Sequence, residues 1–291
     1  GLDLPILFKG TVSIISNSLA SRVMSDKAVT SEILESLGFS VPHTLIVKAN
    51  EIEENIPRLQ KFIDEEKTVV VKPNDSSQGK CIRVGITALE ELLSALRDAC
   101  EASGVNTAVV QSHLFMNEFR ILVFENKVVA ASTRGRAFII GDGKSTVQEM
   151  ILSQYDESYK EMRGREKTKK LDAKLVYEIA KLPKYDKVLK KGERMQIDEL
   201  ATDKLRGAPT RIRSEDVHKD FVELATKVCK SFAAVVVGID LFADDITKPL
   251  KGQKYYLTEL NPSPGTAAVI DKEAFIKDYL DSLYNAHKSL Q

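Results

Sequence analysis

The sequence predicts an α+β fold. Segments of strand and helix character alternate along the chain without an internal repeat, which is typical of mixed α and β architectures. The chain has 291 residues, of which 43% are hydrophobic, so it can bury one large core or two smaller ones. This length and composition exclude an intrinsically disordered chain, a collagen and a small disulfide scaffold.

The overall charge and the cysteines narrow the class further. Lys plus Arg and Asp plus Glu both number 42, so the chain has no net charge and lacks the broad basic field of non-specific nucleic-acid binders. No apolar run approaches the roughly 18 residues of a membrane span, so no membrane partner is expected. Cys81, Cys100 and Cys229 form no CxxC pair. They are interpreted as packing thiols in a reducing, cytoplasmic compartment, not as zinc ligands.

Local signals place the first elements. Ser25 or Asp26 can cap a helix that Gly38 ends. The sequence begins at Gly1 with neither an initiator Met nor a secretory signal, which predicts a trimmed or excised part of a larger protein. Further elements are predicted as strands at 44–47, 68–72 and 107–111, a helix around 89–96, and a hairpin of strands 119–124 and 127–132 joined by Glu125-Asn126.

The second half begins with a turn and a helix start. The stretch 145–149 holds two overlapping capping boxes, so a helix is expected from there to about Ser153. Residues 157–194 contain 13 basic and 7 acidic side chains, which indicates an inserted element that either is solvated or forms a lid, or else recruits an acidic substrate. The last predicted elements are a helix at 216–232, strands at 233–242 and 254–260, and a helix at 274–286.

A candidate metal site lies on the last two strands. If residues whose numbers sum to 497 pair across the hairpin, Asp240 lies opposite Leu257, Glu259 is its diagonal neighbour on the same face, and Asn261 extends that face. Two carboxylates and a carboxamide at the end of a sheet are suitable ligands for Mg²⁺. The alternative is a solvated hairpin face. The apolar residues around Asp240 favour the metal, because an unpaired buried carboxylate is costly.

A second candidate site is a phosphate-binding loop. Lys72 closes an apolar strand and precedes a small-residue loop at 74–80, whose backbone N–H groups could bind a polyphosphate. The alternative is an ordinary exposed turn. Neither a Walker A loop nor a GxGxxG fingerprint is present.

Three more residues could contact a nucleotide. Gln111 ends an apolar strand, and the short connector after it could contact an adenine edge through its backbone. Glu118 could accept hydrogen bonds from ribose hydroxyls. Arg134, after the predicted hairpin, could neutralise a developing phosphate or oxyanion charge, or could simply be an exposed surface residue.

Together these motifs resemble the ATP-grasp superfamily of carboxylate-amine ligases from about Ser25 to Gly265. The branch that the chain is most similar to includes cyanophycin synthetase and the bifunctional glutathione synthetase, a group of glutamate-adding peptide ligases. The motifs that carry the resemblance are Ser25-Asp26-Lys27, 38–42 (Gly-Phe-Ser-Val-Pro), 70–73 (Val-Val-Lys-Pro), 141–147 (Gly-Asp-Gly-Lys-Ser-Thr-Val) and the acidic pair with its Asn-Pro-Ser-Pro-Gly turn.

The resemblance implies a division of the chain and a role for each motif residue. It implies an ATP-grasp fold with an N-terminal segment (1–42), a small lid subdomain (43–115) and a larger antiparallel-sheet subdomain (116–291) that carries the Mg site and the basic insertion at about 157–195. The implied cofactor-binding residues are Lys27, Lys72, Ser76, Ser77, Gly79, Gln111, Leu114 and Glu118; the implied metal ligands are Asp240, Glu259 and Asn261; the implied catalytic residues are Arg134, Lys72 and Arg206.

The implied reaction uses ATP and one or two Mg²⁺ ions, or Mn²⁺. A substrate carboxylate attacks the γ-phosphorus, and an amine intercepts the acyl phosphate to give an amide, ADP and phosphate. Amino acids or short peptides, glutamate-containing ones first, are the expected substrates. A homo-oligomer or a separate N-terminal donor-binding domain is a possible partner, since only about twenty residues precede Ser25.

The sequence departs from that branch at one loop, and other functions stay open. An Asn-Leu-Ser-Thr-Gly-Gly-like loop is replaced by 199–204 (Glu-Leu-Ala-Thr-Asp-Lys), followed by Arg206, so the acceptor pocket is expected to differ. Gln111 stands where a Glu is commonest. The alternative functions are an ATP-grasp kinase and a non-catalytic nucleotide-binding module of a larger synthetase.

Overall fold

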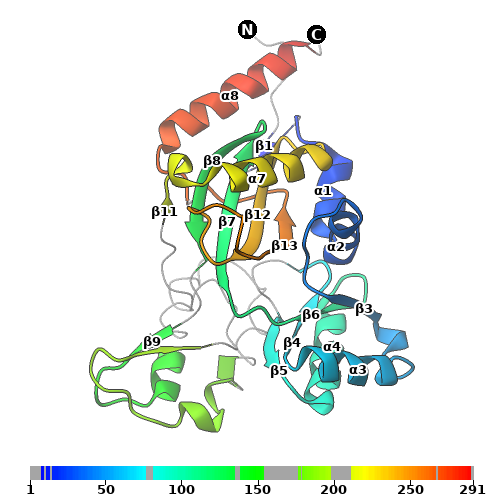
Figure 1. The fold of residues 1–291 in the computed structure, drawn as a ribbon, viewed down its shortest axis with the longest axis vertical. Helices are drawn as coiled ribbons and strands as arrows, with labels where there is room; N and C mark the ends of the chain where they lie inside the picture. Colours follow the sequence, from blue (N-terminus) through cyan, green and yellow to red (C-terminus); the bar gives the residue numbers. More distant parts are fainter. Residues whose placement is uncertain are drawn as a thin grey trace. The chain divides into compact units, whose positions relative to one another are not determined.

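A computed structural model describes residues 8–9, 11–13, 15–76, 81–134, 138–153, 176–177, 179–197, 211–266 and 268–289. Its contacts divide the chain into two compact units (Figure 1). Unit 1 comprises residues 1–42, 114–134 and 209–291, and unit 2 comprises residues 43–113 and 135–208. Residues 135–208 thus group with unit 2, whereas the division inferred from the sequence placed them with 116–134. Spatial contacts, which chain order does not reveal, make this difference.

Unit 1 is built on a five-stranded antiparallel sheet with the order β11-β8-β7-β12-β13. The hairpin β7–β8 turns at Glu125 and Asn126, which both have positive φ, as the predicted two-residue connection requires. The strand bounds are β7 (Asn117–Phe124), β8 (Lys127–Thr133), β11 (Arg211–Ile212), β12 (Val236–Ala243) and β13 (Tyr255–Asn261).

One face of this sheet packs against three helices. Alternate strand residues such as Ile121, Ile239 and Leu257 form a single core with Phe221 and Val228 of α7. The same core includes residues of the two N-terminal helices, so the chain's first helices and its sheet fold together. The helices are α1 (Ser18–Ser25), α2 (Lys27–Ser36) and α7 (Lys219–Ser231).

The opposite face of the sheet changes character along its strands. At one end Leu122, Phe124 and Val236 pack against Phe275 and Tyr279 of α8 (Lys272–Ser289). Because strand residues alternate between faces, the positions two and four residues before Leu122 on β7 share this face, and they are charged. The face therefore has an apolar half under α8 and a polar half beyond it.

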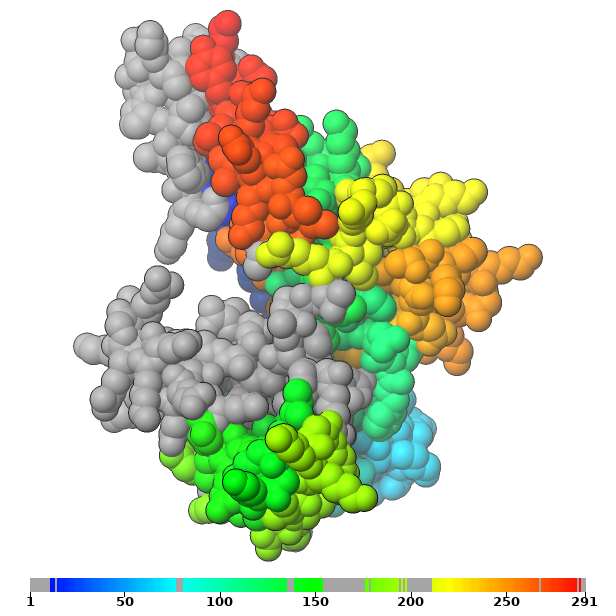
Figure 2. Space-filling model, turned by 90° about the vertical axis from the view of Figure 1, so that its left-hand side faces the viewer, coloured from blue at the N-terminus to red at the C-terminus, as the bar shows by residue number. Residues whose placement is uncertain are grey.

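Helix α8 also presents an apolar stripe outward. Ile276, Leu280 and Tyr284, spaced four residues apart, are each about half exposed. Figure 2 shows α8, in red and orange, at the surface of unit 1.

Unit 2 contains a four-stranded antiparallel sheet with the order β3-β6-β4-β5. Helices α3 and α4 cover one face, where Leu59 and Leu96 pack on Val71 and Val110. The bounds are β3 (Thr44–Lys48), α3 (Ile56–Glu66), β4 (Val69–Pro73), β5 (Arg83–Ile86), α4 (Leu89–Ala102) and β6 (Thr107–Ser112).

A separate small core in unit 2 is formed by residues from 138–153, 176–177 and 179–197, segments that are shown in green to yellow-green in Figure 2. Tyr185 is fully buried there beside Ile139 and Ile151. The backbone N–H groups of Ser145 and Lys144 donate hydrogen bonds to the Asp142 carboxylate. These hydrogen bonds hold the turn before the helix and lower the pKa of Asp142 to about 2. The elements are β9 (Phe138–Ile140), a helix at 147–153, η2 (Pro183–Tyr185) and β10 (Arg194–Gln196).

The basic stretch is therefore packed over its described part. Residues of 179–197 contribute Tyr185 and Leu189 to the small core, while Lys181, Lys184 and Lys190 are exposed. Residues 154–175 lie outside the described residues. Shorter elements complete the fold: β1 (Phe8–Lys9), β2 (Val12–Ser13), η1 (Ala49–Glu51) and η3 (Ser214–Asp216).

Most predicted helix and strand starts are confirmed. The Asp26 side chain caps α2 by accepting from the N–H of Val29, and Gly38 has φ of 79° just after the helix. The capping box of Thr146 and Glu149 is present with both of its hydrogen bonds. The strand predicted to begin at Ala233 begins at Val236 instead, because Ala233 adopts a positive φ at the end of α7.

The three cysteines are free and buried. Burial raises the pKa of the Cys100 and Cys229 thiols, which agrees with packing roles. Among the described helices, none has the length and hydropathy needed to cross a membrane.

The β7–β8 turn gives a test of the fold. Asn126 has φ of 62°, a conformation that costs a β-branched residue about 1–2 kcal/mol. Asn126→Val is expected to lower the free energy of unfolding by about that amount, measured by urea denaturation. Asn126→Gly serves as the control and should leave stability unchanged or raise it. Equal stability of the two variants would contradict the assigned turn.

Candidate active site

Six charged side chains meet on the polar half of the unit 1 sheet. Three are basic and three are acidic; one ion pair joins Lys27 to Glu259, and three more join the other four side chains to one another. We call this group the charged cluster: Lys27, Glu118, Arg120, Arg134, Asp240 and Glu259.

The β12–β13 register brings the two predicted metal carboxylates together. Asp240 pairs directly with Glu259, and Asn261 pairs with Gly238 two positions further along. The predicted pairing of Asp240 with Leu257 is wrong: Leu257 pairs with Leu241, one position from the prediction, and a bulge between Asp240 and Leu241 adds a second position at Asp240. The shift leaves the predicted face intact, since Asp240, Glu259 and Asn261 still lie on one side of the sheet.

Asp240 is the buried centre of the cluster. Only 3% of the residue is exposed, and the Arg120 side chain on the neighbouring strand holds its carboxylate with two hydrogen bonds. The Nε of Arg120 donates to Oδ1 at 2.6 Å, and its Nη2 donates to Oδ2 at 2.5 Å. A guanidine nitrogen of Arg134 lies 3.9 Å from Oδ2. The sequence did not single out Arg120, because the β7–β12 pairing joins residues 120 positions apart.

Glu259 is paired with Lys27 at 3.8 Å. Lys27 is the first residue of α2 and is 6% exposed, although the positive end of the helix dipole disfavours a buried cation there. Glu259 compensates for this charge. A buried lysine at a helix start breaks a local rule, and such exceptions concentrate at functional sites.

Glu118 and Arg134 complete the cluster. The Nε of Arg134 lies 3.8 Å from the Glu118 carboxylate, and the Arg134 backbone N–H donates to the Glu118 carbonyl. These contacts keep Arg134 about one-fifth exposed, so the exposed-surface alternative for this residue is wrong.

Gly238 and the turn after β13 shape the end of this face. The Asn261 carboxamide oxygen accepts from the N–H of Ser263 at 3.0 Å, which orients the side chain. A Cβ at Gly238 would lie 2.9 Å from Cβ of Pro264, 3.6 Å from that of Asn261 and 3.7 Å from Cδ of Arg120. The contact with Pro264 is too close for a side chain, whereas the other two distances are ordinary van der Waals contacts, so Pro264 is the neighbour that requires glycine here.

The donor set fits a divalent cation. Two carboxylates and one carboxamide on one face supply the oxygen ligands that Mg²⁺ prefers. Among the described residues, no group of three or more His, Cys, Asp and Glu side chains could bind a metal without the carboxamide. A cation would have to be accommodated beside three basic side chains that already neutralise the acids.

Unit 2 brings two other predicted residues onto one sheet face. Lys72 on β4 pairs with Val109, and Gln111 on β6 pairs with Val70, so both side chains lie on the face that α3 and α4 leave uncovered. Lys72 is 7% and Gln111 5% exposed, and the Gln111 carboxamide donates to the Thr44 hydroxyl at 2.9 Å. Lys72 itself is therefore buried on a strand, whereas residues 77–80 of the loop that follows lie outside the described residues, so both interpretations of that loop stay predictions.

The remaining predicted residues are less informative. Leu114 is half-buried in the connector between β6 and β7, and Ser76 is half-buried after β4. Ser77, Gly79 and Arg206 lie outside the described residues.

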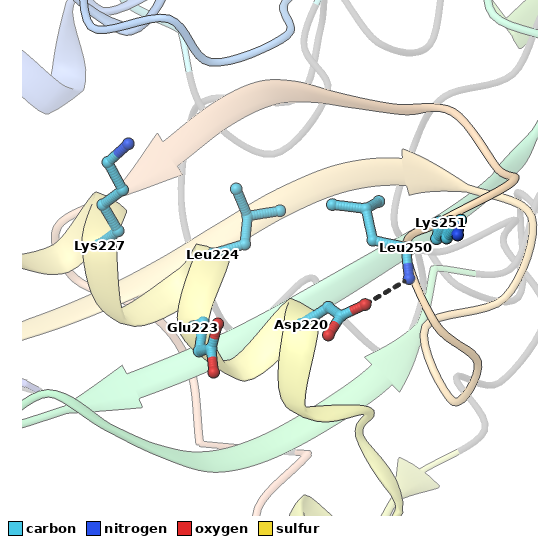
Figure 3. Close-up of a pocket in the computed structure, with 6 residues that line it drawn as sticks. All are labelled: Asp220, Glu223, Leu224, Lys227, Leu250 and Lys251. Carbon is cyan, nitrogen blue, oxygen red and sulfur yellow. Dashed lines mark hydrogen bonds between the residues drawn. The ribbon is translucent and has the colours of Figure 1, made fainter.

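An open pocket in unit 1 is separate from the charged cluster. Figure 3 shows its lining side chains on α7 and on the loop after β12, with Asp220 accepting a hydrogen bond from the N–H of Leu250 at 2.9 Å. Helix α7 covers the sheet face opposite Asp240, so this pocket and the cluster lie on different sides of the sheet. It is lined by Asp220, Glu223, Leu224, Lys227, Leu250 and Lys251.

Sequence comparison finds relatives that are named as synthetases or biosynthesis proteins. The chain is 30% identical over 261 residues to a protein named cyanophycin synthetase from Crocosphaera subtropica, covering 88% of this chain and 29% of that one. It is 24% identical over 251 residues to the glutathione biosynthesis bifunctional protein of Mannheimia succiniciproducens, covering 82% and 32%. The chain thus spans about a third or less of these relatives. No family model matches it.

Solved structures settle the fold. A D-alanine–D-alanine ligase from Bacillus anthracis superposes with a TM-score of 0.56 at 16% identity, over 94% of this chain and 71% of that one. A structure named as an ATP-grasp ligase matches with a TM-score of 0.52 at 13% identity, over 94% and 64%. The chain has the ATP-grasp fold. The bifunctional glutathione synthetase of Pasteurella multocida also matches, with a TM-score of 0.51 at 20% identity over 95% and 38%. The resemblance that the motifs indicated is confirmed.

Gly238 gives a test of the packing at this ATP-grasp sheet end. Gly238→Ala is expected to lower the free energy of unfolding by about 1–3 kcal/mol, because the new methyl group meets Pro264 at 2.9 Å. Gly265→Ala, four residues after Asn261, has nothing within 4 Å of its added Cβ and is the matched control. Urea denaturation of both variants measures the difference, and equal stabilities would contradict the described close approach.

Proposed function

We propose that the chain carries the nucleotide-binding and catalytic part of an ATP- and Mg²⁺-dependent ligase that joins a carboxylate to an amine. The single observation that carries this proposal is the charged cluster, in which two facing carboxylates and a carboxamide share a sheet face with three cations. A phosphate-transfer site needs both oxygen ligands for a cation and positive side chains for anionic oxygens.

Asp240, Glu259 and Asn261 would hold the metal. One or two Mg²⁺ ions, or Mn²⁺, supply neutralisation of the triphosphate charge when bound. Asn261 is already oriented by the N–H of Ser263, and its oxygen has a second lone pair to offer.

The basic side chains would bind the phosphates and stabilise transferred charge. Lys27 is held at the start of α2 in unit 1, and Lys72 is buried on β4 in unit 2. Their ammonium groups are suited to phosphate oxygens as compact positive charges. Arg134 would stabilise the anionic oxygens of the transferring group, since its guanidinium is placed by Glu118 and lies 3.9 Å from Asp240.

The nucleoside would be recognised by polar groups on β6 and β7. Gln111, oriented by Thr44, and the backbone near Leu114 would contact adenine, and Glu118 would accept from ribose hydroxyls. Ser76, Ser77 and Gly79 belong to the loop assigned to the phosphates, and Arg206 is assigned to the acceptor side.

The reaction would proceed in two steps. The substrate carboxylate attacks the γ-phosphorus of ATP and releases ADP, which forms an acyl phosphate. An amine then attacks the acyl carbon, phosphate leaves, and the amine proton is lost as the amide forms. The substrates would be amino acids or short peptides, with glutamate-containing ones first, because the relatives are named for cyanophycin and glutathione synthesis.

A product assay tests this function. Mg·ATP is incubated with the chain and with pooled amino acids and short peptides, and ADP release is measured alongside mass spectrometry of the same tubes. The expected result is ADP together with a product one water lighter than the sum of its two components. ADP with a phosphorylated product would instead indicate a kinase. ATP binding without turnover from any pool would indicate a non-catalytic nucleotide-binding module.

Glu259→Gln tests the metal ligand set. It is expected to lower Mg²⁺-dependent turnover by roughly 10²-fold with the fold intact, because the variant keeps the side-chain shape and loses the charge. Glu223→Gln, in the pocket on the other side of the sheet, is the matched control and should leave turnover unchanged. Turnover of the Glu259 variant equal to that of the unmodified chain would contradict the assignment.

A further inference from the structure

The buried Asp240 carboxylate is fully engaged by the protein's own cation. Both of its oxygens accept from Arg120, at 2.6 and 2.5 Å, in the bidentate geometry that makes guanidinium–carboxylate pairs strong. The side chains are 4% exposed for Asp240 and 16% for Arg120, so water screens this pair little. Any divalent cation that uses Asp240 must compete with this guanidinium.

The other carboxylate of the proposed metal site is held differently. Glu259 is 31% exposed in its side chain and meets Lys27 in a single contact at 3.8 Å. Such a pair is looser than a bidentate one, because it lacks two short hydrogen bonds. Glu259 is therefore accessible to a cation at little cost, whereas Asp240 is not.

The strand register sets Arg120 and a divalent cation in competition for the Asp240 carboxylate. Asp240 pairs with Arg120 on β7 and with Glu259 on β13, so the same carboxylate stands between a guanidinium on one side and an acid on the other. A carboxylate this buried requires a positive partner at all times. Replacement of the guanidinium by a metal ion satisfies that requirement and frees the five N–H donors of Arg120.

We propose that Arg120 is the counter-ion of Asp240 when no metal is bound, and that a divalent cation binds by displacing it. Arg120 thereby lowers the affinity of the site for a free cation and acts as a positioning residue for Asp240. This inference rests on the proposed function, because it takes Asp240 and Glu259 as metal ligands.

The test is direct Mn²⁺ binding to the full chain, measured by electron paramagnetic resonance of free Mn²⁺ without nucleotide. Arg120→Gln is expected to bind Mn²⁺ about tenfold more tightly than the unmodified chain, because the cation no longer displaces a bidentate partner. Arg213→Gln, an exposed arginine paired with Glu215 at 3.8 Å, is the matched control and should bind as the unmodified chain does. The double variant Arg120→Gln, Asp240→Asn should lose the gain, since the gain acts through Asp240.

A second variant keeps the proposal testable if Arg120→Gln does not fold. Arg120→Lys keeps a positive charge but cannot form the bidentate pair, so its Mn²⁺ affinity should lie between those of the unmodified chain and of Arg120→Gln. Thermal denaturation gives an independent readout: Mn²⁺ should raise the melting temperature of Arg120→Gln more than that of the unmodified chain.

Two outcomes overturn the proposal and are distinguishable. Mn²⁺ affinity that is unchanged or weaker in both Arg120 variants, and still lost in Asp240→Asn, would show that Arg120 only supports the metal ligand. Absence of Mn²⁺ binding in every protein would overturn the metal site of the proposed function itself.

Discussion

The site depends on a carboxylate buried in the middle of a sheet. Asp240 lies on β12, the strand between β7 and β13, where few charges are tolerated without a partner. Basic side chains consequently surround it: Arg120 and Arg134 lie near Asp240 itself, and Lys27 pairs with the neighbouring Glu259. Because three basic and three acidic side chains balance, the cluster is neutral as a whole, and a cation and an anionic ligand can enter together without a large net charge being buried.

The two halves of one sheet face perform different tasks. Under α8, Leu122 and Phe124 anchor the sheet through an aromatic cluster with Phe275 and Tyr279. Further along the same β7 strand, Arg120 and Glu118 lie on the same side of the sheet and contact charged side chains instead. The same strands thus run through both halves of the face. Packing in the apolar half fixes the backbone that positions the charged side chains, and such fixed positions are how sites become preorganised.

The separation of the chain into two units places candidate nucleotide-binding residues on two independent scaffolds. In unit 2, Lys72 and Gln111 are held by their β4–β6 pairing, while α3 and α4 pack only on the opposite face. The lysines at 181–191 extend from a segment that is packed into the small core around Tyr185. The described part of the basic stretch is therefore an ordered surface. Each unit therefore presents its charged groups from strands or packed turns whose backbone is already fixed.

The sequence by itself determined the turns, the caps and the motif residues. Asp26 at the start of α2, the Glu125-Asn126 turn and the capping box at Thr146 act through neighbours within a few residues, so local chemistry was sufficient to place them. The common face of Asp240, Glu259 and Asn261 followed from strand alternation, although its register did not, because a bulge is decided by packing on both sides of the hairpin. Only the tertiary structure showed Arg120 on Asp240 and Lys27 on Glu259, because these pairs join strands and helices more than 100 residues apart in the chain.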